Sequence, residues 1–259
     1  MRPLPAPAAL AAPAVLAALA LAAAGCTGAP RPPAADAAAA TAAAPGGSSA
    51  GPEYDAAAVR ALAVTDADLA PGWHVTLMQP GQNDISSPPQ TADTPACQPV
   101  LDALTPSKGA AGPLAETDLG IARDGDAPAA LYTAVLAFRP GRAAAVHSGL
   151  DRVLDRCRAF TSTAGRHLLT RLDTPTPGGA DAATAFTLTD ETGGTTIVQR
   201  ALVTRTGDLL AVFTTLDATG RPAPEPDRGV VAAQLAKLGR DGKGPGPREG
   251  APAGGAVSS

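Results

Sequence analysis

An apolar run near the N-terminus limits most strongly how this chain can fold. It predicts that the first part of the chain is an export signal and not part of the folded domain. Arg2 supplies the positive charge of a secretory signal, and residues 8–22 form its core of Ala, Leu and Val. The small residues 23–25 precede Cys26, as expected before a cleavage site. We therefore predict that the chain leaves the cytoplasm and folds in a compartment where disulfides persist.

The end of this run resembles the lipobox of bacterial lipoproteins. Ala24, Gly25 and Cys26 match its usual form, Leu-Ala-Gly-Cys, while Ala23 stands where a leucine is usual. The resemblance implies cleavage before Cys26 and attachment of a diacylglyceryl group, with palmitate as an acyl chain. Two acyl chains anchor a protein stably, whereas one does not. We therefore expect a lipid-anchored protein on the outer face of the cell membrane.

Two other outcomes for the N-terminal segment remain open. Signal peptidase could cut after residues 22–24, Ala-Ala-Ala, and release a protein without lipid. The run could also stay uncut, because an apolar stretch of about 20 residues can span a bilayer. Prolines at positions 5, 7 and 13 would interrupt so short a helix, which makes the uncut span the weakest of the three alternatives.

The aromatic residues mark the limits of the folded domain. Tyr54 is the first and Phe213 the last, and both ends of the 259-residue chain are instead rich in Ala, Pro, Gly and Ser. Such segments bury too little apolar surface to offset the entropy lost on ordering. We therefore divide the chain into a signal peptide (1–25), a tether (26–52), one sensor-like domain (53–239) and a disordered tail (240–259).

The charge pattern argues against a nucleic-acid partner. The formal net charge is −4, and basic residues form no dense run interleaved with aromatic residues. A nucleic-acid-binding surface would need such a basic patch. The partner that the sequence predicts is instead the membrane, through the N-terminal lipid.

The three cysteines predict one disulfide. If Cys26 carries lipid, Cys97 and Cys157 remain, and two cysteines in an exported domain are most simply bridged. Closing a loop of about 60 residues contributes roughly 4 kcal/mol in the chain-entropy model. A reactive or metal-binding thiol is the alternative, but neither residue lies in a Cys-x-x-Cys motif or near a histidine at ligand spacing.

Hydrophobic periodicity predicts an α+β domain: an antiparallel sheet of about six or seven strands with helices packed on it. Residues 140–160 form the clearest helix, since apolar residues recur on one face from Val146 to Cys157. Residues 129–139 and 209–216 are apolar on both faces, which is typical of strands at the centre of a sheet. Further helices are predicted at 54–64, 95–104 and 227–238, and further strands at 73–79, 116–123, 167–172, 182–190 and 195–205.

No motif of a reaction centre is present. The sequence lacks the short motifs of serine nucleophiles, zinc proteases and phosphate-binding loops. His74, His147 and His167 lie on different predicted elements, and we expect them at scattered surface or boundary positions. The chain is therefore predicted to be non-catalytic, with no metal and no cofactor.

Charged clusters and the single tryptophan have structural as well as functional interpretations. Asp190 and other carboxylates near predicted turns are explained by turn chemistry. The arginines of residues 152–158 could hold an anion, but a solvated helix face paired with Asp151 and Asp155 explains them better. Trp73 follows a Pro-Gly turn and is interpreted as a core residue or as an anchor at the rim of a ligand cleft.

The order of these features resembles the exported sensor-like lipoproteins of high-GC Gram-positive bacteria, related to the PknH-type extracellular sensor domain. The resemblance implies helices on one side of an antiparallel sheet and a cleft for an extracellular ligand. This chain departs from the pattern, because it has no kinase segment and no second disulfide pair. The matching stretches are 68–73 (Asp-Leu-Ala-Pro-Gly-Trp), Cys97 with 99–101 (Pro-Val-Leu), the helix 150–160 ending in Cys-Arg-Ala-Phe, and the paired strands within 186–213.

These observations together predict a membrane-anchored, extracytoplasmic, non-catalytic domain that binds a small or lipidic ligand. A protein-interaction subunit of an envelope complex is the first alternative, and a flat exposed apolar patch would favour it. A hydrolase of unrecognised geometry is the second. A serine or aspartate within hydrogen-bond reach of a histidine inside a pocket would favour that alternative.

Overall fold

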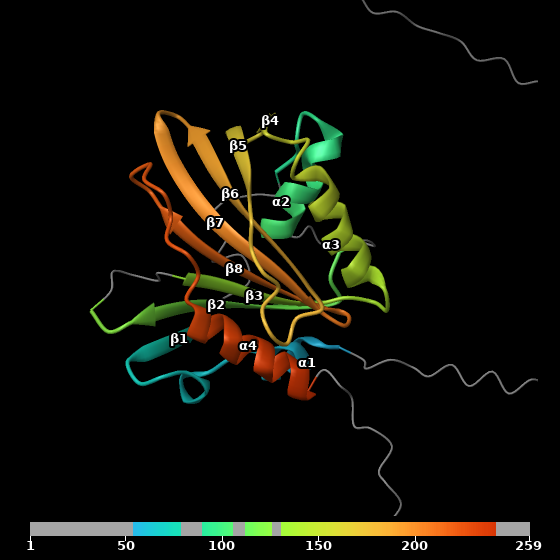
Figure 1. Cartoon of the computed structure of the whole chain (residues 1–259), viewed down its shortest axis with the longest axis vertical. Helices are drawn as coiled ribbons and strands as arrows, with labels where there is room; N and C mark the ends of the chain where they lie inside the picture. Colours follow the sequence, from blue (N-terminus) through green and yellow to red (C-terminus); the bar gives the residue numbers. More distant parts are fainter. Residues whose placement is uncertain (1–53, 79–89, 106–111, 126–130, 242–259) are drawn as a thin grey trace, which may run out of the picture. The chain divides into compact units, whose positions relative to one another are not determined.

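The computed structural model describes residues 54–78, 90–105, 112–125 and 131–241. The described strands form one antiparallel sheet of eight strands in the order β1-β2-β3-β8-β7-β6-β5-β4 (Figure 1). Cys26, the predicted signal peptide and tether, and most of the predicted tail lie outside the described residues. The strands are β1 (Trp73–Leu77), β2 (Ala115–Arg123), β3 (Leu131–Ala137), β4 (Ala159–Ser162), β5 (Gly165–Leu172), β6 (Ala182–Thr192), β7 (Thr195–Thr206) and β8 (Leu209–Asp217).

The fold of the described residues is α+β as predicted, but its sheet has eight strands where about six or seven were expected. The additional strand is β4, which lies in the stretch predicted as the end of a long helix. Helix α3 (Arg142–Val153) ends earlier, and the Leu169 amide donates to the Arg158 carbonyl at 2.9 Å. Pairing with β5 thus takes the main-chain groups that a longer helix would need. Four residues are too few to show a reliable period-two pattern.

Two meanders meet at the centre of the sheet. β1, β2 and β3 form one, β4 to β8 form the other, and β3 pairs with β8 so that Ala134 lies opposite Val212. The β6–β7 hairpin turns at Gly193 and Gly194, whose φ angles are 58° and 86°. Two adjacent residues with positive φ suit the tight turn that matches strand twist, and glycine adopts them without a Cβ clash.

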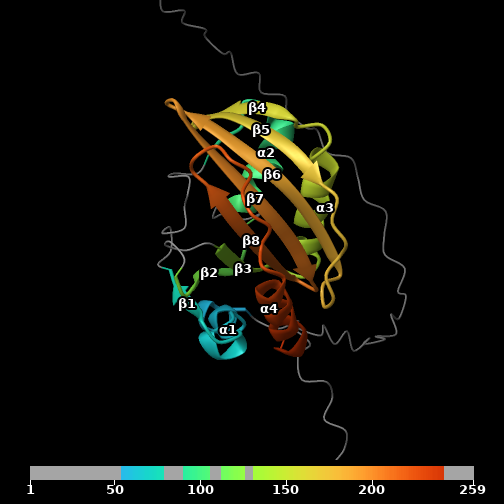
Figure 2. The same ribbon diagram turned by 60° about the vertical axis from the view of Figure 1, so that its left-hand side comes forward.

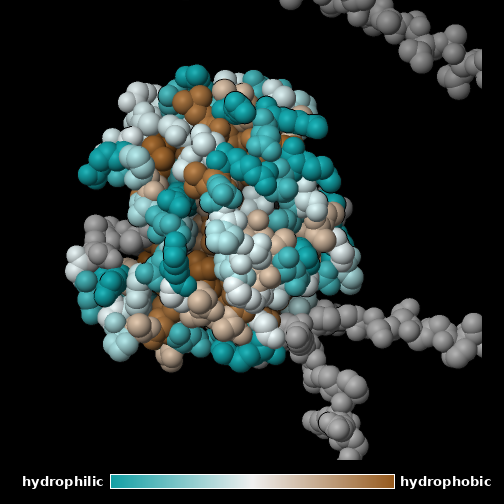
Figure 3. Space-filling view, viewed as in Figure 1, coloured by the Kyte–Doolittle hydropathy of each residue, from teal (hydrophilic) through white to brown (hydrophobic). Residues whose placement is uncertain are grey.

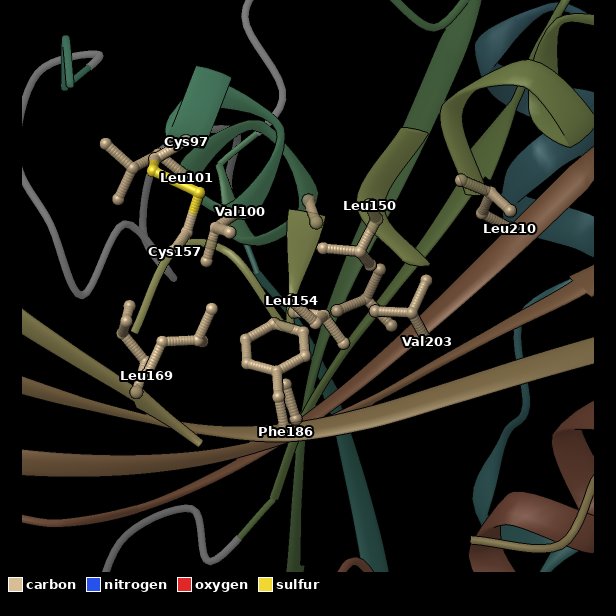
Figure 4. Packing of buried hydrophobic residues seen from close by; sticks show 14 of the residues in the cluster. Cys97, Val100, Leu101, Leu150, Leu154, Cys157, Leu169, Phe186, Val203 and Leu210 are labelled. Atoms are coloured by element: carbon tan, nitrogen blue, oxygen red, sulfur yellow. A yellow bond between two sulfur atoms is a disulfide. The ribbon is translucent and has the colours of Figure 1, made fainter. Parts of the chain in front are cut away.

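One face of the sheet carries η2 (Pro95–Cys97), α2 (Gln98–Leu104) and α3, which enclose what we call the disulfide-side core. Phe186 and Val203 project from the sheet towards Val100 and Leu154 (Figure 4). The Cys97–Cys157 disulfide closes the edge of this core, with 5.6 Å between the two Cα atoms. The predicted bridge is therefore confirmed.

The opposite face carries α1 (Ala56–Ala61) and α4 (Arg228–Asp241), which enclose the α4-side core (Figure 2). In β8, Leu210 and Val212 face the disulfide side, while Leu209 and Phe213 face the α4 side. The expectation that helices cover one side was wrong. Strands that are apolar on both faces need a layer on each side to remove that surface from water.

Candidate functional site

An apolar cavity of about 260 Å³ lies on the α4 side of the sheet. Figure 3 shows apolar surface recessed between more hydrophilic side chains in this part of the molecule. The segment 174–178, which connects β5 to β6, and residues 225–226, which precede α4, form its rim. The strands contribute Ala185, Ala201 and Leu202, and α4 contributes Val231 and Ala232.

The connecting segments at the cavity are tied to the sheet by polar contacts. Asp181 accepts hydrogen bonds from Arg205 Nη1 at 2.9 Å and from the Gly207 amide at 2.8 Å. The Thr206 hydroxyl donates to the Gly179 carbonyl at 3.1 Å. Gly179 has a φ of 92°, which glycine adopts without strain, and this segment packs against Leu235 of α4. The cavity wall is therefore held in place by the fold.

The mouth of this cavity carries a net positive charge. Glu225 lies between two arginines: its Oε2 is 3.2 Å from Arg200 Nη2, and its Oε1 is 3.3 Å from Arg228 Nε. Two guanidinium groups and one carboxylate leave one positive charge uncompensated among these three groups. Because Arg228 is 89% exposed, its side chain can turn towards an incoming anion at little cost.

A second cavity, of about 480 Å³, lies beside α2 and is more polar. Gln98 donates to the Gln90 carbonyl at 3.0 Å and to Asp102 at 2.8 Å, which holds the short segment 90–92 against the helix. The Gln98 side chain also accepts from the Ala92 amide at 2.8 Å. Amides, hydroxyls and a carboxylate contribute to its lining, so this cavity suits a polar occupant or water.

A hydrogen-bonded chain of side chains lies at the edge of the disulfide-side core. His167 Nε2 is 2.7 Å from Ser162 Oγ, and its Nδ1 is 2.6 Å from Asp190 Oδ1. The Gln199 amide donates to the other oxygen of Asp190. Gln90 Oε1 lies 2.8 Å from the same serine hydroxyl. Asp190, interpreted from sequence as a turn residue, is instead within β6, opposite a buried histidine.

The three histidines lie apart, as expected, but only one is on the surface. His74 is exposed, and its hydrogen bond to Asp124 raises its pKa above the ordinary value. His147 in α3 is buried, its Nε2 has no hydrogen-bond partner, and burial lowers its pKa. His167 is 1% exposed. The expectation of surface or boundary positions was therefore wrong for His147 and His167, because α3 and β5 turn these two side chains into the interior.

The remaining predicted residues are placed as follows. Trp73 in β1 is half-buried, with the Arg123 guanidinium 5.8 Å from its ring centroid, and it lines neither cavity described above. Asp151 in α3 and Asp155 just after it pair across to the sheet: Arg171 is 2.7 Å from Asp151 and 3.5 Å from Asp155. The arginines of residues 152–158 are exposed, in agreement with a solvated face.

Two further properties concern only the described part of the chain. There, no group of three histidine, cysteine or acidic side chains is arranged to hold a metal ion. No helix in those residues combines the length and apolarity needed to cross a membrane.

Solved structures that are similar to this chain include two mycobacterial proteins. One is the extracellular domain of PknH from Mycobacterium tuberculosis, with 14% identity, a TM-score of 0.46, and coverage of 73% of this chain and 97% of that one. The other is an Rv0999 ortholog from Mycobacterium smegmatis, with 17% identity, a TM-score of 0.39, and coverage of 72% and 98%. The first is a domain of the type that the sequence resembles. No protein-family model and no curated protein sequence matches the chain.

Proposed function

We propose that this chain is an extracytoplasmic lipoprotein whose domain binds a small ligand in the cavity between β7 and α4. The N-terminal signal ending in Cys26 supports export and anchoring, and the disulfide suits an oxidising compartment. The cavity is the observation that supports ligand binding. It is concave, mostly apolar and bounded by segments tied to the sheet, which are the features of a pre-formed small-molecule site.

The cavity favours a ligand with an apolar body and an anionic end. Ala185, Leu202 and Val231 supply the apolar contacts. At the mouth, Arg200 and Arg228 already hold the Glu225 carboxylate, so a ligand carboxylate or phosphate finds the same donors close by. A fatty acid or another small amphiphile of the envelope has this combination of parts.

A fluorescence titration tests the binding site. We expect 1-anilinonaphthalene-8-sulfonate, which has an apolar body and a sulfonate, to bind the mature protein at one saturable site and to be displaced by octanoate. Ala232 lines the cavity and is exposed, so an Ala232→Trp substitution should block the site without disturbing the core. Affinity should fall by about tenfold or more, which corresponds to roughly 1.4 kcal/mol.

The matched control for this titration is Ala236→Trp. Ala236 is also exposed on α4 but is absent from the cavity lining, so its tryptophan should leave affinity unchanged. Equal binding by both tryptophan variants, or no saturable binding at all, would contradict the assignment of the ligand to this cavity.

The alternative of a protein-interaction subunit has weaker support. Within the described residues, the large apolar side chains that are clearly exposed are Leu77, at 41%, and Leu114, at 45%. They belong to β1 and to the segment before β2, and two such residues fall short of the contiguous patch that marks a docking surface. The cavity is therefore the stronger observation.

A further inference from the structure

The side chains of Ser162, His167 and Asp190 have the connectivity of an acyl-transfer centre. They come from the end of β4, from β5 and from β6, and two hydrogen bonds of 2.7 and 2.6 Å join them through the imidazole ring. We propose that Ser162 is the nucleophile of a serine hydrolase centre that cleaves short-chain carboxylic esters. The site lies on the disulfide side of the sheet, and so apart from the ligand cavity. This proposal departs from the expectation of a non-catalytic domain.

The surroundings of His167 fix the ring in the orientation that a general base requires. A carboxylate only accepts hydrogen bonds, so Asp190 places the proton on Nδ1 and leaves the Nε2 lone pair facing Ser162 Oγ. The ring stacks on Phe160 with 4.8 Å between ring centroids. Gln199 donates to the second oxygen of Asp190 and so holds the carboxylate as well. Asp190 and Gln199 are positioning residues in this arrangement.

Ser162, unlike His167, is within reach of solvent. It is half-buried at the β4–β5 turn, between the exposed residues Thr161 and Thr163, whereas His167 is enclosed. Gln90, whose side chain touches the hydroxyl, also lines the polar cavity beside α2. Neither Ser162 nor His167 lines that cavity, so among these three side chains Gln90 alone connects it to the hydroxyl. Because the hydroxyl belongs to a half-buried residue, we expect only esters with a small acyl group to reach it.

The serine hydroxyl has one proton to donate and two acceptors near it. It accepts from the Ala164 amide at 3.0 Å, and either Gln90 Oε1 or His167 Nε2 receives its proton. Acyl transfer requires the proton to go to His167. Rotating the Gln90 amide by half a turn achieves this, because its NH₂ then faces Ser162 Oγ. The same NH₂ is placed to donate to the oxyanion that forms next to Oγ.

The reaction then proceeds in two balanced halves. Ser162 Oγ attacks the ester carbonyl carbon, its proton passes to His167 Nε2, and the carbonyl π electrons move to oxygen. Collapse expels the alkoxide, which takes the proton from His167 and leaves as the alcohol. Water attacks the acyl-serine, giving its proton to His167, and that proton returns to Ser162 Oγ as the carboxylic acid leaves.

A fluorophosphonate probe tests the nucleophile directly, since a serine activated in this way displaces fluoride and becomes phosphonylated. We expect stoichiometric modification of Ser162 in the mature protein, located by peptide mass mapping and absent from Ser162→Ala. Ser148→Ala is the matched control, because Ser148 is an exposed serine of α3, and it should label like the wild type.

Hydrolysis of p-nitrophenyl acetate distinguishes a role of Asp190 in positioning His167 from a role in folding. Asp190→Asn should lower kcat by at least about 100-fold with KM nearly unchanged, because the asparagine amide favours the wrong imidazole tautomer. Asp124→Asn, which breaks an exposed pair to His74, should leave kcat unchanged. An unlabelled but folded wild type, equal labelling of Ser162→Ala, or equal kcat in Asp190→Asn would each overturn the proposal. None of these outcomes would affect ligand binding at the α4-side cavity.

Discussion

One carboxylate oxygen of Asp68 accepts three hydrogen bonds, which the neighbouring sequence does not predict. Its Oδ2 accepts from the Thr65 amide at 2.8 Å, from the Thr65 hydroxyl at 2.9 Å and from Lys237 Nζ at 2.8 Å. The hydrogen bond from Lys237 is the main cause that lowers the pKa of this carboxyl to about 2. The hydrogen bonds from Thr65 also lower this pKa. A residue near the N-terminal end of the domain is thereby fastened to α4 near the other end.

This contact predicts an acid-sensitive contribution to stability. Since the folded pKa of about 2 is below the ordinary 3.8, the contribution is complete above about pH 4 and is lost as the pH falls towards 2. Lys237→Met should lower the free energy of unfolding by about 1 kcal/mol at pH 7, and by much less at pH 2. Urea unfolding at both pH values measures this. An equal loss at both values would contradict the ion pair as the cause.

Gln234 has a structural role that depends on contacts with residues far away in the sequence. It is fully buried, and its amide accepts from the Val64 N–H at 3.0 Å and donates to the Leu62 carbonyl at 2.8 Å. It thus satisfies two main-chain groups just after α1, which would otherwise be buried without partners. In the sequence it is one polar residue in an otherwise apolar stripe.

At the scale of elements, the α3–β4 boundary shows where periodicity misleads. Leu154, Cys157 and Phe160 are all buried, so the apolar spacing of the helix continues after the helix has ended at Val153. Burial by the disulfide-side core requires only that these side chains point inward. Pairing with β5 decides the backbone conformation, and a helical pattern cannot anticipate it.

The disulfide connects two elements and predicts a measurable stabilisation. Cys97 ends η2, and Cys157 follows α3, so the bridge closes a loop with a sequence separation of 60. Replacing both cysteines with alanine should lower the free energy of unfolding by about 4 kcal/mol, because the unfolded chain regains the entropy of the open loop. Urea unfolding of the oxidised wild type and the double variant gives the difference. A loss below about 1 kcal/mol would show that the bridge contributes little.

At the scale of the whole molecule, two helical layers enclose the centre of the sheet. β3 and β8 are neighbours in the middle of the strand order, and both send apolar side chains to both faces. Their sequences, apolar on both faces, already indicated a central position, which is confirmed. The pattern predicted only the central placement of these strands, and the second covering layer, which the family resemblance did not imply, emerged from the structure.

Anchoring of the whole molecule is tested at Cys26. In a lipoprotein-processing host, radiolabelled palmitate should enter the wild type and should be absent from Cys26→Ala, which lacks the thiol that forms the thioether. Ala23→Leu, which restores the usual lipobox residue, should be labelled at least as well as the wild type. Equal label in the Cys26→Ala variant, or a wild-type N-terminus that stays uncut, would contradict lipid anchoring.

The sequence by itself determined the α+β class, the central strands and the pairing of Cys97 with Cys157, because each depends on composition or on spacing along the chain. Tertiary structure alone decided the eighth strand, the second helical layer and the apolar cavity. It also brought Ser162, His167 and Asp190 together, since β5–β6 register and the β4 turn set their distances. Register and layer packing are selected by the interactions of the whole chain, and no local pattern records them.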